Sequence, residues 1–404
     1  MNREMEMYYA TNKLFLSLIG GWPYQQKTLK ILKLCFFASI QFSAIVPQVL
    51  VLYDTWGDMD IAVNCLVNFV IIIAGTIKLT NIVVNNNKFR QLLQHMIEHW
   101  ELFNSEFEQH ILRRYANIGQ TIRRYYGVYV IVTLTLYLSM PLVPKILNVI
   151  IPLNESRPLM YVYQAEYRVE KEKYYNLIFF HSCVATSITA IILFTVDTTY
   201  IMCVLHACGL FAAVSRRLKN ITGKTKSDDH ENVQIRISHH VIMKKHNSIG
   251  NNHRELMICL KKHQIALEYA QIFNSMFTYV TLVLLCTNMM ILSVIGIQLI
   301  NNIKNTGESI RYIFILFGVF VHLACMCSPG QFLINHSTNI FDEAYNLRWY
   351  TFSTKTRKLL IMLLYRSLVP CKLTAGKSFV MSMSMLNTMI RTAMSYFTTF
   401  LSMR

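Results

Sequence analysis

The sequence predicts an all-α, polytopic membrane protein with seven transmembrane helices, a cytoplasmic N-terminus and an extracellular C-terminus. Three observations lead to this fold class: a high apolar content, seven apolar stretches of membrane-spanning length, and an uneven distribution of basic residues among the loops. Hydrophobic residues make up 53% of the 404 residues and charged residues only 15%, whereas soluble domains carry about 25% charged residues. We therefore expect residues 1–404 to form a single membrane domain.

Seven apolar stretches are long enough to cross a bilayer, which requires about 20 apolar residues in each helix. Polar residues such as Gln41, Asn68, Asp197 and His322 interrupt several of them. Because polar groups need partners inside a membrane, these interruptions indicate a bundle with a solvated or ligand-filled interior. The spans are expected approximately at 31–53, 60–83, 127–150, 175–206, 271–300, 312–335 and 374–401.

The basic residues predict the orientation of the chain in the membrane. Lys and Arg number 29 in the N-terminal segment and the loops on the same side of the membrane, but only 8 on the other side. Cytoplasmic loops carry an excess of Lys and Arg, so the N-terminus is expected inside. Long loops follow this rule less closely, but without the longest one, 207–270, the numbers are still 18 and 8.

Two polar segments between the spans have distinct patterns. In residues 88–103, apolar side chains recur at helical spacing, which predicts a helix that extends from the second span and packs on its neighbours. A helix lying on the membrane surface is the alternative, although its acidic residues oppose anionic lipid. Residues 220–253 are polar and rich in His, which predicts a mobile surface loop.

No residue pattern supports an enzyme, a metal site or nucleic-acid binding. The phosphate-binding G-x-G-x-x-G and G-x-x-x-x-G-K-[ST] motifs and the nucleophile motif G-x-S-x-G are absent from the sequence. His95 and His99 share a helix face, but no H-E-x-x-H motif or acidic third ligand accompanies them. The basic residues are spread over several loops instead of one patch. We therefore expect no catalysis, metal, cofactor or nucleic-acid partner, and contact with membrane lipid.

Charged and aromatic residues inside the spans are the candidates for a functional interior. Lys78 and Asp197 are expected to form a structural ion pair, because charges at membrane depth face the bundle interior and pair. In the extracellular halves, aromatic and Met side chains with a few polar groups suit a pocket for a small, mostly apolar molecule. Ordinary core packing is the alternative, since any helix bundle has this composition. The candidate ligand residues are Asn68, Phe69, Tyr137, Met140, Phe180, His181, Val184, Ser187, Ile188, Tyr312, Leu316 and Phe320.

Four segments carry a resemblance to a known family. They are PLNESRPLMYVYQAEYRVEKEKYYNLIFFH at 152–181, GLFAAVSRRL at 209–218, CLKKHQIALEYAQIF at 259–273, and a last helix that begins LTAGK at 373 and contains SYF at 395–397. Together they resemble the insect odorant receptors, in particular the tuning subunits of ants, bees and wasps. Departures occur in the last helix, where Ser384, Leu386 and Arg391 stand in place of the family's usual Glu, Phe and Lys.

The resemblance implies a fold and a function. Family members are seven-helix subunits with a cytoplasmic N-terminus that form tetramers around a pore, and tuning subunits assemble with a common co-receptor subunit. A small volatile odorant binds in the extracellular half of the tuning subunit and opens a cation pore. The implied location is the plasma membrane, in the dendrite of a sensory neuron. The alternative is a seven-helix G-protein-coupled or gustatory-type chemoreceptor, but the Asp-Arg-Tyr and Asn-Pro-x-x-Tyr motifs of the first are absent.

The resemblance also implies pore residues on the last helix. The family's gate lies two and six positions after the Phe of the Ser-Tyr-Phe motif, which here gives Thr399 and Met403, with Tyr396 nearby. These positions are four residues apart and therefore share a helical face. The alternative is that they face lipid or a neighbouring helix. Asn154 begins an Asn-Glu-Ser sequon in the second extracellular loop and is the expected glycosylation site.

Overall fold

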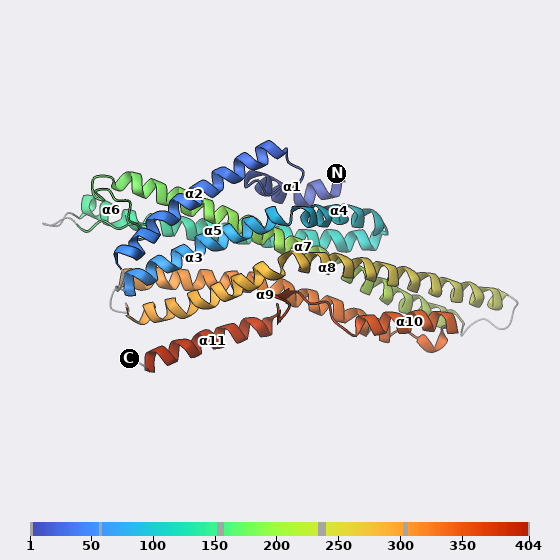
Figure 1. Cartoon of the computed structure of the whole chain (residues 1–404). Helices are drawn as coiled ribbons and strands as arrows, with labels where there is room; N and C mark the ends of the chain where they lie inside the picture. Colours follow the sequence, from blue (N-terminus) through green and yellow to red (C-terminus); the bar gives the residue numbers. More distant parts are fainter. Residues whose placement is uncertain (1–2, 56–58, 152–156, 233–239, 302–305, 403–404) are drawn as a thin grey trace.

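The computed structural model describes residues 3–55, 59–151, 157–232, 240–301 and 306–402, and these residues are mostly helical (Figure 1). This confirms the predicted all-α class. The short elements are the 3-10 turns η1 (Met140–Leu142) and η2 (Trp349–Thr351) and the strands β1 (Thr374–Ala375) and β2 (Phe379–Val380). The α-helices are α1 (Arg3–Leu18), α2 (Lys27–Asp54), α3 (Met59–Val84), α4 (Asn86–Leu102), α5 (Glu106–Ser139), α6 (Val143–Ile150), α7 (Tyr175–Asn232), α8 (His240–Asn301), α9 (Thr306–Tyr345), α10 (Thr354–Ser367) and α11 (Met383–Ser402).

Six helical stretches among the described residues are long and apolar enough to span a membrane, and they coincide with the first six predicted spans. The seventh predicted span corresponds to α11, which has 20 residues but is not one of the six. The six stretches are Lys27–Asp54, Cys65–Val84, Glu106–Ile150, Tyr175–Ile221, Asn251–Ile300 and Ser309–Tyr345.

The long helices run between two ends of the molecule (Figure 1). The α6 end contains α6, the connection from α6 to α7 and the C-terminal end of α11. The α10 end contains α10, the last turns of α7 and the first turns of α8. With 58 residues, α7 is about 87 Å long, nearly three times the hydrocarbon thickness of a bilayer. The α10 end therefore projects well beyond the membrane.

The predicted surface loop at 220–253 is wrong for most of that segment. Helix α7 continues to Asn232 and α8 begins at His240, while residues 233–239 lie outside the described part of the chain. The segment contains no proline, and its glycines are Gly223 and Gly250. Its residues therefore include no strong helix breaker. The polar composition indicates contact with water but does not set the end of a helix.

The predicted amphipathic helix at 88–103 is α4, and it packs against α3 and α8. Phe89, Leu92 and Met96 on its apolar face are buried completely. Nearby, the buried Glu108 of α5 lies 2.7 Å from Nζ of Lys262 on α8 and 3.0 Å from Nε of Arg217 on α7. These contacts confirm a helix packed on its neighbours, in a bundle whose helices are joined by buried ion pairs.

The last predicted span begins later than expected, because residues 374–380 form a hairpin instead of a helix. Gly376 and Lys377 have φ values of +59° and +65°, which a right-handed helix does not accept. The hairpin is bound to α8, since Asn274 Oδ1 accepts from the Thr374 backbone N–H at 2.7 Å and the Thr278 carbonyl accepts from that of Gly376 at 2.8 Å. Helix α11 therefore starts at Met383 and not at residue 374.

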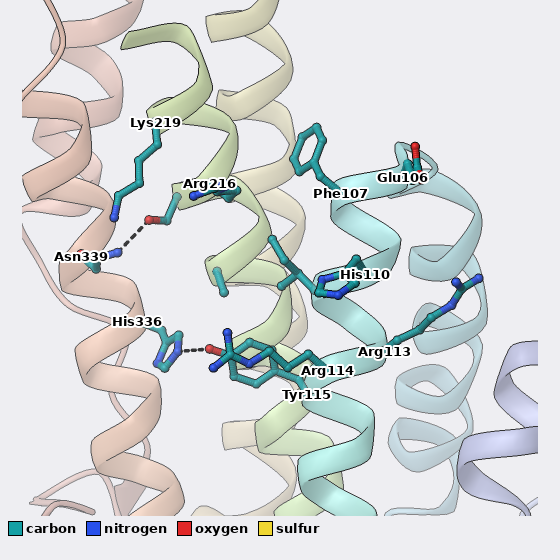
Figure 2. A pocket seen from close by; sticks show the side chains of 13 residues that line it. Glu106, Phe107, His110, Arg113, Arg114, Tyr115, Arg216, Lys219, His336 and Asn339 are labelled. Atoms are coloured by element: carbon teal, nitrogen blue, oxygen red, sulfur yellow. Dashed lines mark hydrogen bonds between the residues drawn. The ribbon is translucent and has the colours of Figure 1, made fainter. Parts of the chain in front are cut away.

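Helices α5 and α9 both pack on α7. Toward the α10 end an open cleft lies between them, with α7 at its back (Figure 2).

Candidate functional site

A cavity of about 290 Å³ lies among α3, α5, α7, α8 and α9, in the part of the bundle toward the α6 end. Each helix contributes side chains at intervals of three or four residues, so one face of each helix borders the hollow. On α5 these are Tyr126, Tyr129, Val130, Thr133, Leu134 and Tyr137. The cavity is thus a shared interior of five helices and not a groove on one of them.

The lining is mainly aromatic and aliphatic, with a few polar groups. Ligand pockets for small molecules combine these two features, because apolar surface supplies affinity and polar groups fix orientation. Apart from the α5 residues, the lining consists of Asn68, Ile71 and Ala74 of α3, Met140 of η1, Thr186, Ala190, Leu193 and Asp197 of α7, Leu284, Thr287, Asn288 and Ile291 of α8, and Arg311, Phe314, Ile315, Gly318, Val319 and His322 of α9.

Hydrogen bonds close the outer end of the cavity, toward the α6 end. The hydroxyl of Tyr137 lies 2.9 Å from the carbonyl oxygen of Val162 and 3.2 Å from Oδ1 of Asn68. The guanidinium of Arg311 donates to the same Val162 carbonyl at 3.3 Å and lies over the Tyr137 ring. The connection between α6 and α7 is therefore fixed over the outer end by three helices.

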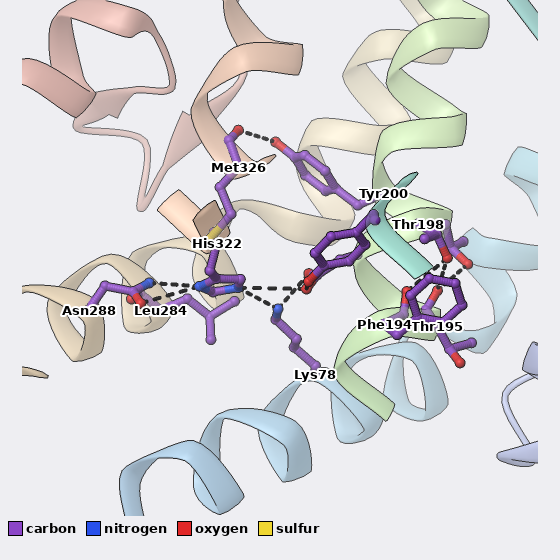
Figure 3. Close-up of polar contacts among 12 residues, drawn as sticks. Lys78, Phe194, Thr195, Thr198, Tyr200, Leu284, Asn288, His322 and Met326 are labelled. Atoms are coloured by element: carbon purple, nitrogen blue, oxygen red, sulfur yellow. Dashed lines mark hydrogen bonds and ion pairs between the residues drawn. The ribbon is translucent and has the colours of Figure 1, made fainter. Parts of the chain in front are cut away.

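An ionic cluster forms the inner end of the cavity (Figure 3). Nζ of Lys78 on α3 lies 2.5 Å from Oδ1 of Asp197 on α7 and 2.7 Å from Nε2 of His322 on α9. The Tyr126 hydroxyl donates to Oδ2 of Asp197 at 3.1 Å. Lys78 is 2% exposed and Asp197 6%. The predicted ion pair between Lys78 and Asp197 is confirmed, and it borders the cavity through its carboxylate.

The hydrogen bonds of the cluster define the proton position on His322. A Lys ammonium can only donate, so Nε2 of His322 accepts from Lys78 and the ring proton lies on Nδ1. Nδ1 is 3.2 Å from Oδ1 of Asn288, which accepts that proton. The amide of Asn288 in turn donates to the Leu284 carbonyl at 2.7 Å. The polar end of the cavity is therefore an ordered network across α3, α7, α8 and α9.

The structure brings Asn68, Tyr137 and Met140 together in the cavity lining, as members of the predicted ligand set. Among the others, Phe180 is 66% exposed on α7, Tyr312 is buried in the core, and His181 bonds to Ser43 and Tyr167 at 2.9 and 2.8 Å. The predicted residues that lie outside the lining are Phe69, Phe180, His181, Val184, Ser187, Ile188, Tyr312, Leu316 and Phe320.

Sequence reasoning missed the α8 wall and the inner end of the cavity. The signal that points to them is polarity within apolar stretches: Asp197 and His322 are such interruptions, and Thr287 and Asn288 form a similar pair in the stretch 271–300. On α7 and α9 the apolar residues occur on all faces, so composition cannot select the face that borders the cavity. A change of one or two positions moves a side chain to a neighbouring face.

The pore and glycosylation candidates lie away from the cavity. Tyr396 and Thr399 are exposed on α11, and Tyr396 is 52% exposed. Met403 and Asn154 fall outside the described residues.

With this geometry established, comparisons identify the family. The sequence model of the family described as 7tm Odorant receptor matches residues 58–394. The chain belongs to the odorant receptor family. This odorant receptor is 23% identical over 367 residues to Odorant receptor Or2 of Anopheles gambiae, with 87% of each chain covered. It is 21% identical to Odorant receptor 13a of Drosophila melanogaster, with 95% of this chain and 93% of that receptor covered.

Solved structures show the same fold. The insect olfactory receptor OR5 from Machilis hrabei in complex with eugenol matches with a TM-score of 0.78, at 12% identity and over 99% of both chains. The structure of OR5 described without eugenol matches with a TM-score of 0.74, at 13% identity. The family match confirms the predicted family of this multi-pass membrane protein, and the shared fold agrees with it. Together they decide against the G-protein-coupled alternative.

Proposed function

We propose that this odorant receptor is the odour-binding subunit of a heteromeric ligand-gated cation channel, in which a small volatile odorant in the cavity opens a pore lined by α11. The observation that carries the proposal is the cavity itself, an apolar hollow with an ordered polar end inside an odorant receptor fold. The complex of the similar receptor OR5 with eugenol supports a small organic ligand.

The cavity favours one class of odorant: a mainly apolar molecule with one hydrogen-bonding group. A ligand that buries about 200 Å² of apolar surface gains about 5 kcal/mol, part of which offsets its lost freedom of motion. The polar group of the ligand would bind Asn288, Tyr126 or His322 at the inner end. It needs such a partner, because it loses its hydrogen bonds with water when it enters the cavity. Shape would then determine the ranking of ligands, and the inner end their orientation.

Filling the cavity tests this proposal. The receptor is expressed with and without the co-receptor subunit, and currents are recorded against an odorant panel. Ala190→Phe places a ring inside the cavity and should raise the half-maximal odorant concentration by about tenfold or more, since a steric loss of 1.4 kcal/mol has that effect. Phe180→Ala on the exposed face of α7 is the control. Odorant responses that change with Phe180→Ala and not with Ala190→Phe would place the ligand elsewhere.

Helix α11 has the pattern of a pore-lining helix. Six hydroxyl residues recur three or four positions apart and form one polar stripe, within about 40° of the helix face on which Thr388 lies. The opposite face is buried through Leu386, Met389 and Ala393. The hydroxyls of Thr388, Thr392, Thr399 and Ser402 donate to carbonyls of α11 itself, so their oxygens keep lone pairs that water in a pore can contact. The stripe consists of Ser384, Thr388, Thr392, Ser395, Thr399 and Ser402.

Charge on this stripe tests the pore assignment. Thr399→Asp should change basal current and ion selectivity and leave odorant preference intact, because a carboxylate in a narrow pore attracts cations. Arg391→Gln, at the edge of the stripe, is a second charge change on the same helix. Unchanged selectivity in Thr399→Asp at normal surface expression would exclude this face from the pore.

Helix α10 offers a surface for the co-receptor subunit. It lies outside the six apolar stretches, yet Ile361, Met362, Tyr365 and Leu368 are between 59% and 81% exposed. An apolar patch of this kind on a water-exposed helix is typical of a subunit interface. Tyr365→Lys with Ile361→Lys should reduce co-purification with the co-receptor subunit. Lys355→Gln with Lys358→Gln changes charge on the same exposed side of the helix without removing its apolar side chains, and should not.

The orientation belongs to the same proposal. We propose that the N-terminus and the α10 end lie in the cytoplasm and the α6 end outside, in the plasma membrane of a sensory dendrite; the excess of basic residues supports this orientation. The cavity then lies in the extracellular half of the bundle, within reach of an odorant arriving from outside.

A further inference from the structure

The cleft between α5 and α9 is a second hollow, separate from the odorant cavity, and we call it the basic cleft (Figure 2). Its volume is about 890 Å³. Basic residues of all three helices line it: His110, Arg113 and Arg114 of α5, Arg216 and Lys219 of α7, and His336 of α9. The Arg113 side chain points away from α7 and α9 (Figure 2).

Helical spacing concentrates these charges in one place. His110 precedes Arg113 and Arg114 by three and four residues, and Arg216 precedes Lys219 by three, so each set shares a helix face. Glu106 is the one carboxylate among the residues that line the cleft. Lys219 pairs with Glu343 at 2.9 Å. Arg114 and Arg216 are exposed and, within the part of the chain that the structure describes, have no carboxylate at ion-pair distance.

The walls of the basic cleft are fixed by hydrogen bonds (Figure 2). Nδ2 of Asn339 donates to the Ser215 hydroxyl at 2.7 Å and joins α9 to α7. His336 Nδ1 bonds to the Phe332 carbonyl at 2.8 Å, so its Nε2 accepts from the Tyr115 hydroxyl and joins α9 to α5. The cations therefore project from a preorganised frame and not from a mobile loop.

We propose that the basic cleft binds a small anion that carries two or more phosphate groups. Guanidinium groups match phosphate oxygens in pairs, and the charge-assisted hydrogen bonds are about twice as strong as neutral ones. Arg114 on α5 and Arg216 on α7 stand on different walls of the cleft, so two phosphate groups can each pair with one of them. The volume is in the range of about 300–1,000 Å³ that small-molecule sites occupy. A concave site of this size fits one compact anion better than a nucleic acid, which needs an extended basic surface.

Phosphates of this kind occur on free small molecules and on lipid headgroups, and one experiment distinguishes the two. The full-length receptor is purified and placed in phosphatidylcholine nanodiscs, with or without about 5% phosphatidylinositol bisphosphate. Soluble inositol trisphosphate and inorganic phosphate are added separately to the nanodiscs without phosphatidylinositol bisphosphate, and binding is followed by calorimetry and by the melting temperature. The proposal does not depend on the channel assignment, because no current is measured.

The variants remove or preserve charge at matched sites. Arg114→Gln with Arg216→Gln should weaken binding by about tenfold or more, since each lost charge-assisted bond contributes at least 1.4 kcal/mol. Arg114→Lys with Arg216→Lys keeps the positive charges and should retain part of the binding affinity. The control, Arg124→Gln with Lys261→Gln, removes the same charge from exposed positions outside the cleft. Because Arg114 and Arg216 are exposed, the single Gln variants provide the same test if the double variant does not fold.

Each outcome decides the proposal. Binding of inositol trisphosphate, or stabilisation by the phosphorylated lipid alone, supports it and identifies the source of the phosphates. It is overturned if neither polyphosphate binds more tightly than inorganic phosphate, or if the control variant loses as much binding as the cleft variant.

Discussion

At the scale of single residues, the ionic cluster around Lys78 both stabilises the helix bundle and forms the polar end of the cavity. A buried ammonium needs its partners, because an unpaired charge in a low-dielectric interior is far less stable than in water. Here Asp197 and His322 both accept from Lys78, and both also border the cavity among α3, α5, α7, α8 and α9. The polar end of this cavity is therefore held by the same hydrogen bonds that stabilise the helix bundle.

Removing the charge of Lys78 alone should lower the free energy of unfolding more than removing the charges of Lys78 and Asp197 together. Lys78→Met leaves the Asp197 carboxylate buried without its counter-ion and should destabilise the fold by about 3–5 kcal/mol. The double variant, Lys78→Met with Asp197→Leu, removes both charges and should recover much of that loss. The melting temperature of the solubilised receptor measures both effects. A double variant as unstable as the single one would show that Asp197 has other essential partners.

At the scale of elements, a buried histidine pair joins α4 to the middle of α7. Nδ1 of His99 lies 3.1 Å from Nε2 of His206 on α7, with the rings stacked. Burial, and then the neighbouring His206, lower the pKa of His99 from 6.5 to about 2. The folded protein therefore keeps this imidazole neutral at a pH where the unfolded chain would protonate it.

The depressed pKa of His99 predicts a pH-dependent stability. The unfolded chain binds a proton at His99 below about pH 6.5 and the folded chain does not, so the contribution is complete above pH 6.5 and is lost as pH falls. The slope is about 1.4 kcal/mol for each pH unit. Melting temperatures between pH 7.5 and 5 should fall less in His99→Gln than in the wild type. Gln94→Ala, on the exposed side of α4, is the control and should keep the wild-type slope.

The hairpin before α11 makes a second element-scale prediction. Gly376 has a φ of +59°, and a Cβ there would lie 2.5 Å from Cδ2 of Leu282. Gly376→Ala should therefore destabilise the receptor by about 1–2 kcal/mol and displace the hairpin from α8. Gly119→Ala, whose Cβ would lie 3.5 Å from Leu205, should be neutral or stabilising. Equal melting temperatures for the two variants would contradict this role of Gly376.

The elements also show which parts of the structure a sequence can predict. Apolar length predicted six spans, and helical periodicity predicted α4, because both patterns are local. The continuation of α7 and α8 beyond the membrane was not predicted, since polar residues suit an exposed helix as well as a loop. The cavity was predicted through Asn68, Tyr137 and Met140 but not through α8, because which helix faces meet depends on packing between distant segments.

At the scale of the whole molecule, orientation in the membrane is the property that glycosylation can test. The sequons begin at Asn154, Asn220 and Asn335. With the N-terminus inside, Asn154 alone is presented to the glycosylation machinery, so mass spectrometry of the receptor should find glycan there and Asn154→Gln should abolish the mobility shift. Glycan on Asn220 would reverse the orientation. Thr222→Ala, which removes that sequon, is the matched control and should leave the shift unchanged.

Helix α8 touches both the proposed odorant cavity and the last helix. Asn288 borders the cavity, Thr278 binds the hairpin that precedes α11, and Gly296 lets the ring of Phe397 approach its backbone, where a Cβ would lie 3.0 Å from that ring. A rigid helix transmits a displacement at its middle to both contacts. The efficacy of an odorant should therefore depend on how far it displaces α8, whereas its affinity should depend on how much apolar surface it buries. Two odorants with equal affinity can then act as a full and a partial agonist.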